Sequence, residues 1–199
     1  MSDTSSETYT QALGAPLPFP DSEYARRNDE TRRRMAEANL DALLLFHQES
    51  MFYLFGYDQL GYWVYQTAIM TPGSRDIHAL SRGVDHDLIV GMPNVREVRT
   101  WIDDDVRNPG QSTGEMLKGL GVLRAGARIG IELQSHALLP YYYKALVEAL
   151  PDHVTLVDCS TLVTDQRIAK SDSEIVYMRE AGKVMDAAYV GAFGAFREG

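Results

Sequence analysis

The chain contains 199 residues, of which 45% are hydrophobic and 24% are charged, so it is long enough for one globular domain and an additional segment. Its formal net charge of −9 argues against broad binding to nucleic acid or to an anionic membrane surface. No run of about 18 apolar residues predicts a membrane-spanning helix, and the first residues lack the regions of a signal peptide, so we expect a cytoplasmic protein. The single cysteine, Cys159, is expected to be a reduced core residue.

The N-terminal part of the chain predicts an arm followed by a helix. Residues 1–20 are rich in Ser and Thr and end in a proline-rich stretch, which predicts a flexible, extended arm. Asp21 or Ser22 can act as the N-cap of the helix. The face expected to be buried carries Tyr24, Asn28, Thr31, Met35 and Ala38. The arginines expected mostly on the solvated side are Arg26, Arg27, Arg32, Arg33 and Arg34.

Six short segments rich in apolar, aromatic and β-branched residues predict strands. In chain order these segments are residues 41–46, 62–70, 75–80, 95–101, 128–132 and 154–158. The first is continuously apolar, as in a strand buried on both faces. Pro72 and Gly73 suit a type II turn, so the strands on either side of them should form an antiparallel hairpin. Residues 83–90 are ambiguous, and residues 103–110 predict a loop.

Helices are expected between these strands. A short helical turn capped by Ser50 should break at Gly56, a helix follows the capping-box pair Ser112 and Glu115, and Pro140 suits the first position of another helix. This order of elements predicts an α/β fold, with a mixed sheet covered by helices on both faces. We expect it to fill residues 21–165 as one domain.

Residues 166–199 predict a linker and one long helix. Ser171 and Glu174 have the S-x-x-E spacing of a capping box, so the helix should begin at Ser171. Apolar positions recur at steps of three and four along it, at Ile175, Met178, Gly182, Met185, Tyr189, Ala192 and Phe196. Nothing after this stripe can cover it, so we predict an interface that uses its large members, Met178, Met185, Tyr189 and Phe196.

The sequence offers few residues for catalysis or metal binding. The five histidines show no H-x-x-x-H or H-E-x-x-H spacing, and none is paired with a cysteine. Residues 85–87 (Asp-His-Asp) and 103–105 (three Asp) contain consecutive groups that point in different directions, so a solvated loop or strand end is the better interpretation. No phosphate-binding loop or nucleophile motif is present. We therefore predict that this chain alone binds no metal and contains no catalytic residue.

Aromatic residues gather between positions 52 and 65, next to the glycine at position 56. Rings with polar tips suit a surface that lines a small-molecule pocket or an interface, whereas a core hairpin is the alternative interpretation. Because a strand alternates its faces, we expect about half of the cluster in the core. The same alternation predicts that Tyr62 and Trp63 point to opposite faces. The candidate substrate-gating residues are Tyr57, Asp58, Tyr62, Trp63, Tyr65 and Gln66.

Four stretches together resemble the N-terminal domain of the creatinase, prolidase and aminopeptidase P family. They are residues 39–44 (NLDALL), 52–57 (FYLFGY), 128–132 (RIGIE) and 167–171 (RIAKS) with Glu174. The resemblance implies a ribonuclease-H-like mixed sheet, followed from the junction at 167–171 by the first helix of a C-terminal pita-bread domain. Residues 56–58 and 62–66 are most similar to members that cleave non-peptide C–N bonds, such as ectoine hydrolase and creatinase.

The same resemblance implies that the chemistry lies elsewhere. In this family two Asp, one His and two Glu hold two divalent ions, such as Mn, Zn, Co or Fe, and all five ligands lie beyond the first pita-bread helix. Dimeric members use the N-terminal domain at the mouth of the partner subunit's active site. Creatinases have a Phe and an Arg there, where this sequence has Tyr62 and Val64, which argues against creatine as the substrate.

Two functions follow from these observations. The first is the substrate-gating and dimerisation domain of a truncated metallohydrolase, whose catalytic domain lies outside this chain. We expect that enzyme to form a homodimer and to cleave a C–N bond in a short peptide or a small molecule. The second is a stand-alone binding or dimerisation module of the same fold. The uncovered stripe favours the first.

Overall fold

The computed structural model describes residues 17–59, 61–103 and 107–197. The chain divides into two compact units, one ending at Gln166 and one beginning at Arg167, and each is described by itself. The prediction of a flexible arm falls mostly on residues 1–16, which lie outside the described residues. Leu17 packs against the core of the first unit, and the ring of Phe19 lies edge-on to that of Tyr24 at 6.2 Å.

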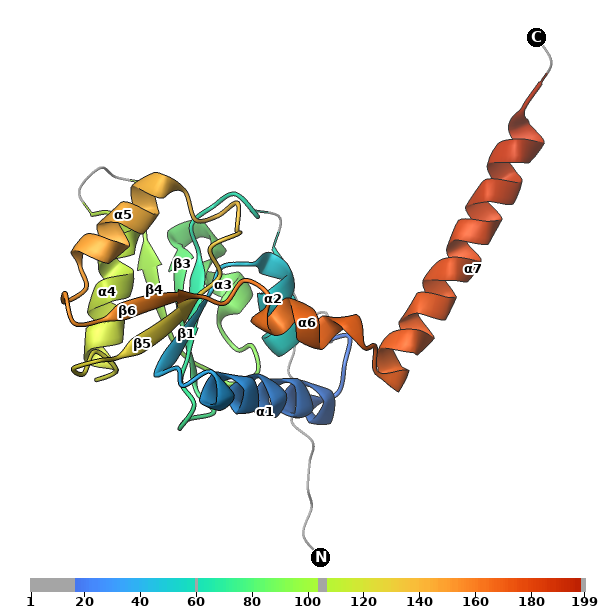
Figure 1. Cartoon of the computed structure of the whole chain (residues 1–199). Coiled ribbons are helices and arrows are strands. Elements are labelled where there is room, and N and C mark those ends of the chain that lie inside the picture. Colours follow the sequence, from blue (N-terminus) through green and yellow to red (C-terminus); the bar gives the residue numbers. More distant parts are fainter. Residues whose placement is uncertain (1–16, 60, 104–106, 198–199) are drawn as a thin grey trace, which may run out of the picture. The chain divides into compact units, whose positions relative to one another are not determined.

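The first unit is built on a six-stranded mixed sheet, which confirms the predicted fold class (Figure 1). In chain order its strands are β1 (Ala42–Leu45), β2 (Thr67–Met70), β3 (Ile77–Arg82), β4 (Val95–Trp101), β5 (Arg128–Ile131) and β6 (Thr155–Asp158). They lie side by side in the order β4-β3-β2-β1-β5-β6. Strand β2 is antiparallel to both β1 and β3, whereas β1, β5 and β6 run parallel to one another and β3 runs parallel to β4.

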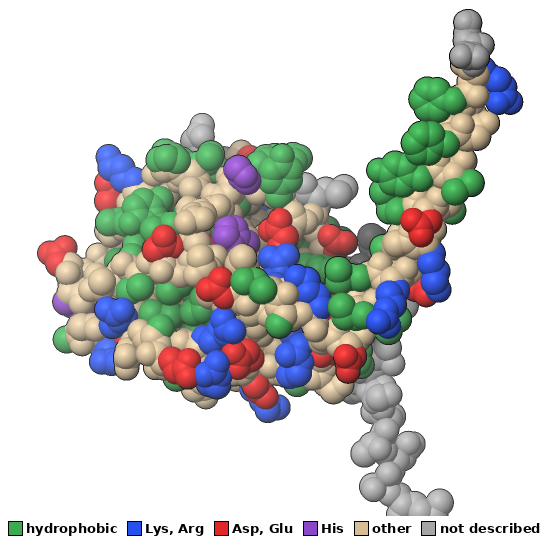
Figure 2. All heavy atoms as spheres, turned by 45° about the vertical axis from the view of Figure 1, so that its right-hand side comes forward, with side chains coloured by type: hydrophobic (Ala, Val, Ile, Leu, Met, Phe, Trp, Pro, Cys, Tyr) green, Lys and Arg blue, Asp and Glu red, His purple; other side chains and the backbone are tan. Residues whose placement is uncertain are grey.

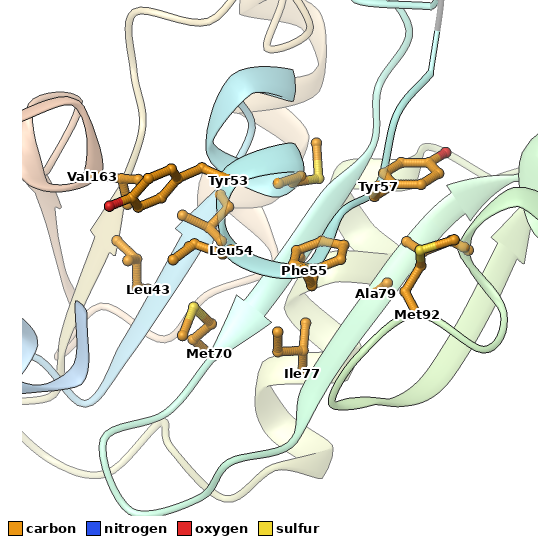
Figure 3. Packing of buried hydrophobic residues seen from close by; sticks show 14 of the residues in the cluster. Leu43, Tyr53, Leu54, Phe55, Tyr57, Met70, Ile77, Ala79, Met92 and Val163 are labelled. Atoms are coloured by element: carbon orange, nitrogen blue, oxygen red, sulfur yellow. The ribbon is translucent and has the colours of Figure 1, made fainter. Parts of the chain in front are cut away.

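Helices cover both faces of the sheet, as the sequence predicts. In chain order the helices of this unit are α1 (Asp21–Glu37), α2 (Gln48–Phe55), η1 (Gly83–Asp85), α3 (His86–Ile89), α4 (Pro109–Gly119), α5 (Pro140–Glu148) and α6 (Leu162–Ile168), the last of which crosses into the second unit. On one face Leu43 packs with Leu54 of α2 and Val163 of α6 (Figure 3). On the other face Leu44 packs with residues of α4 and α5. Strand β1 is therefore buried on both faces, as its continuous apolar run predicts.

Helix α1 buries the expected face, but the prediction that its arginines are mostly outside is wrong for two of them. Arg27 is fully buried and Arg32 is 9% exposed. The guanidinium of Arg27 lies over the rings of Phe19 and Tyr53, and its Nη1 donates to the Tyr53 carbonyl oxygen at 2.9 Å. Hydrogen bonds to the backbone and contacts with aromatic faces compensate for removing this cation from water.

Several predicted starts are wrong. Helix α1 begins at Asp21 with Pro20 as its N-cap, so neither Asp21 nor Ser22 caps it, and β3 begins at Ile77 rather than at residue 75. The strand predicted at 62–70 begins only at Thr67. Helix α4 begins at Pro109, where the side chain of Asn108 accepts a hydrogen bond from the N–H of Gly110, so Ser112 and Glu115 lie inside the helix. Helix α2 begins at Gln48 rather than at Ser50. It ends at Phe55, and the C-cap Gly56 has a φ of 78°, which explains the glycine. The ambiguous residues 83–90 form η1 and α3, and α6 was not predicted.

The second unit contains α7 (Asp172–Ala195), which begins as predicted. The N–H of Glu174 donates to Ser171 Oγ at 3.3 Å, and the N–H of Ser171 donates to Glu174 Oε2 at 2.8 Å, which is a complete capping box. From Val176 onward the described side chains of α7 are exposed, and hydrophobic ones gather on its C-terminal half (Figure 2). Among the described residues, no helix has the length and apolar character needed to cross a membrane.

Candidate functional site at the carboxyl ends of β1 and β5

The carboxyl ends of the parallel strands β1 and β5 meet at one edge of the sheet. Chain segments leave the sheet there, so backbone N–H groups and side chains are not used by strand pairing. Strand β1 is followed by Phe46 and His47, and β5 is followed by Glu132. In open α/β sheets such an edge is the usual position of a binding site.

Glu132 ties the two strand ends together. Its side chain is completely buried, and its Oε2 accepts hydrogen bonds from the N–H groups of Phe46 and His47, both at 2.7 Å. Its Oε1 accepts from Ser50 Oγ at 2.6 Å and lies 3.4 Å from His47 Nδ1. A buried carboxylate needs partners of this kind, because charge removed from water must be compensated. The start of α2 is thereby fixed to the end of β5.

The carboxylate also controls the charge of His47. A hydrogen bond to Glu132 raises the pKa of the His47 imidazole, against the opposing effect of burial. The Gln134 carbonyl and the nearby Glu49 carboxylate raise this pKa further. At the end of β6, hydrogen bonds from the Ser160 hydroxyl and N–H lower the pKa of Asp158, as does the charge of His47. The edge therefore combines carboxylates with an imidazole whose pKa is raised by them.

A pocket of about 340 Å³ opens beside this cluster. It is lined by His47, Gln48, Glu49, Tyr62, Ser135 and His136. The ring of Tyr62 lies edge-on to the rings of Trp63 at 4.9 Å and of His136 at 6.0 Å. Two aromatic side chains of the predicted gating segment thus stand at the pocket or next to it.

The structure separates the six predicted gating residues into two groups. Tyr62 and Trp63 are 54% and 60% exposed, and Asp58 is also exposed. The prediction that Tyr62 and Trp63 point to opposite faces of a strand is wrong, because they precede β2 and their rings touch. Since neither residue lies in a strand, the alternation of side chains between the two faces of a sheet does not determine where they point.

The other three, Tyr57, Tyr65 and Gln66, are buried. Tyr57 Oη donates to Gln66 Oε1 at 2.5 Å, and Gln66 Nε2 donates to Asp85 Oδ2 at 2.9 Å. Burial, with the Asp85 charge as a smaller cause, raises the pKa of the Tyr57 hydroxyl. These bonds hold Tyr57 and Gln66, the two ends of the segment 57–66, close to η1. The three buried residues therefore anchor this segment and do not line the pocket.

The sequence prediction missed His47, Glu132, Ser135 and His136. One signal was available, because Glu132 directly follows a short apolar strand, and such a position lies at the edge where parallel strands end. The spacing of the histidines carried no such signal, since His47 and His136 are brought together by the pairing of β1 with β5.

The described residues do not fit a catalytic metal centre. Within residues 17–59, 61–103 and 107–197, no group of three or more His, Cys, Asp and Glu side chains could hold a metal ion. A divalent ion that activates water needs about three protein ligands. Two of the three consecutive aspartates, at 104 and 105, lie outside the described residues.

Comparisons with known proteins agree with this architecture. Residues 27–169 match the family model of the creatinase/prolidase N-terminal domain. A hydrolase/peptidase of Sinorhizobium fredii, itself uncharacterised, is 28% identical over 180 residues, which cover 85% of this chain and 44% of that protein. Ectoine hydrolase of Halomonas elongata is 28% identical over 173 residues, which cover 85% of this chain and 43% of the relative.

The fold is also found among solved structures. Recombinant prolidase from Thermococcus sibiricus has a TM-score of 0.72 at 18% identity, over 88% of this chain and 45% of that chain. The chain thus spans less than half the length of the curated relatives it matches. Because the family model covers residues 27–169, the chain belongs to the creatinase/prolidase N-terminal domain family.

Proposed function

We propose that this chain is the N-terminal, substrate-gating and dimerisation domain of a pita-bread metallohydrolase that cleaves a C–N bond. The bond would lie in an Xaa-Pro-type peptide, or in a small amide or amidine such as ectoine or creatine. The observation that carries the proposal is the match of residues 27–169 to the model of this N-terminal domain. The curated relatives are more than twice as long as the part that aligns with this chain. In this proposal a catalytic domain outside the 199 residues holds the divalent metal, which would be Mn, Zn, Co or Fe.

The gating role is proposed for Tyr62 and Trp63. Both rings are more than half exposed, and Tyr62 lines the pocket at the end of the sheet. An exposed aromatic pair can close over a neighbouring active site, exclude water and orient a small substrate without touching the metal. Tyr57, Tyr65 and Gln66 would act as positioning residues, because they are the buried members of the segment 57–66.

We expect Tyr62→Ala and Trp63→Ala each to lower kcat/KM of the longer protein by roughly 10- to 100-fold, because a misplaced substrate loses much of the rate. The midpoint of thermal unfolding should stay within about 2 °C, since both side chains are largely exposed. Assays with ectoine, creatine and an Xaa-Pro dipeptide would identify the substrate class. Tyr141→Ala, at an exposed tyrosine of α5, is the matched control and should leave the kinetics unchanged. Normal kinetics for both segment variants would contradict the gating role.

The dimerisation role is proposed for α7. The large side chains Met178, Met185, Tyr189 and Phe196 are 54%, 55%, 59% and 78% exposed. Burial of apolar surface stabilises by roughly 25 cal/mol per Å², so such a stripe favours association.

The double variant Met185→Glu/Tyr189→Glu should convert the 199-residue chain from a dimer to a monomer, because two carboxylates would have to be buried in the interface. Sedimentation velocity would measure the change. Lys183→Glu, on the polar side of the same helix, should leave the dimer intact. An unchanged oligomer in the double variant would exclude this stripe as the interface.

The alternative proposal, a stand-alone binding or dimerisation module, differs in what the gene encodes. An open reading frame after codon 199 that supplies two Asp, one His and two Glu in a second domain supports the hydrolase. A stop codon at that position supports the module.

A further inference from the structure

The pocket beside Tyr62 is surrounded by more negative than positive charge. Glu49 is exposed at the first turn of α2 and lines the pocket. Glu132 does not line the pocket, but it is buried against His47, which does. Asp158 also interacts electrostatically with His47. Three carboxylates thus lie around the His47 imidazole. Since His47 is already held by Glu132, the Glu49 carboxylate is the charge that a ligand in the pocket would meet.

The remaining wall suits an organic group. Tyr62 and His136 contribute two rings, which lie edge-on to each other with an interplanar angle of 77°. Gln48 adds an amide, while the Ser135 hydroxyl already donates to the Phe46 carbonyl at 2.9 Å. An aromatic face close to a carboxylate is the usual surroundings of an ammonium or guanidinium group, because both attract a cation.

Two other ligand classes fit less well. An anion would be repelled by the exposed Glu49 carboxylate that lines the pocket. A metal ion would need three close ligands, and the described part of the chain contains no such group.

We infer that the pocket lined by Gln48, Glu49, Tyr62 and His136 binds a small organic cation, with its amidinium, guanidinium or ammonium group paired with Glu49 and its carbon skeleton against the two rings. This binding uses only residues of the first unit. It therefore holds whether or not a longer protein is a hydrolase.

Benzamidine, benzamide and benzoate are matched probes, because they share one aromatic ring and nearly one shape but carry a positive charge, no charge and a negative charge. In NMR titrations of the 199-residue chain, benzamidine should shift the amide resonances of Gln48, Tyr62 and His136 with millimolar affinity. Benzamide should bind at least about threefold more weakly, and benzoate should not bind.

Two substitutions locate the cation. Glu49→Gln and Tyr62→Ala should each weaken benzamidine binding by about two- to fivefold, the loss expected for an exposed ion pair or cation–π contact. Glu148→Gln and Tyr141→Ala, which change exposed residues of α5, are the controls and should have no effect. Equal binding of benzamide and benzamidine, or an unchanged affinity in Glu49→Gln, would overturn the assignment. Shifts centred on a separate pocket, which Trp101 and Tyr142 line, instead of on Tyr62 would also overturn it.

Discussion

Replacing Glu132 with alanine should lower the free energy of unfolding by about 3–5 kcal/mol, the loss expected when one partner of a buried charged cluster is removed. The substitution leaves the N–H groups of Phe46 and His47 and the hydroxyl of Ser50 without their acceptor. It also removes the carboxylate that pairs with His47. Urea denaturation followed by circular dichroism would measure the change.

Glu148→Ala is the matched control for this experiment. Glu148 is an exposed carboxylate on α5, 3.8 Å from Lys144, and its loss should change the stability by less than about 0.5 kcal/mol. Glu132→Gln should fall between the two, because an amide oxygen can still accept one set of hydrogen bonds but its NH₂ group cannot. If Glu132→Ala unfolded at the same urea concentration as the unmodified chain, Glu132 would not be what joins α2 to β5.

Gly110→Ala should destabilise the first unit by about 2–3 kcal/mol, because α4 and α5 approach each other too closely for a side chain at this position. A methyl group on Gly110 would collide with the carbonyl oxygen of Tyr142 and would lie 2.8 Å from the backbone nitrogen of Leu146. Both neighbours belong to the backbone of α5, so neither can move aside without shifting that helix. The midpoint of thermal unfolding should fall by about 5–10 °C.

Gly119→Ala, at the last residue of the same helix, tests whether the effect comes from packing. Within the described part of the chain, a methyl group there would come within 4 Å only of Arg99 Nη2, at 3.9 Å. Alanine favours helix more than glycine does, so this variant should be slightly more stable, by about 0.5 kcal/mol. Equal losses in both variants would mean that the contact with α5 does not control stability at Gly110, because helix propensity favours alanine at both positions and cannot cause a loss.

The sequence predicts the elements whose cause is local. The burial of β1 on both faces and the capping box of Ser171 and Glu174 were predicted correctly. Both features depend on residues that are neighbours in the sequence. The exposed position of Arg27 was predicted wrongly, because its compensating partners come from α2 and from Phe19. Helix periodicity carries no information on such distant partners.

The candidate site was harder to predict than the fold. A run of aromatic and β-branched residues suggested one long strand at 62–70, but the hydrogen bonds of Tyr57 and Gln66 hold its first part off the sheet. The sequence therefore identified Tyr62 as a surface candidate but gave it the wrong surroundings. His47 and His136 could be assigned to one pocket only once β1 and β5 were known to be neighbours.

The pairing of β1 with β5 also constrains how the chain folds while it is being synthesised. Phe46 and the carboxylate of Glu132 that accepts its N–H are 86 positions apart. At about 5–20 residues per second, a ribosome needs roughly 4–17 s to make the chain between them. During that interval β2 and β3 can form their hairpin, whereas β1 keeps one open edge. A nascent chain in this state would be a natural client for ribosome-associated chaperones.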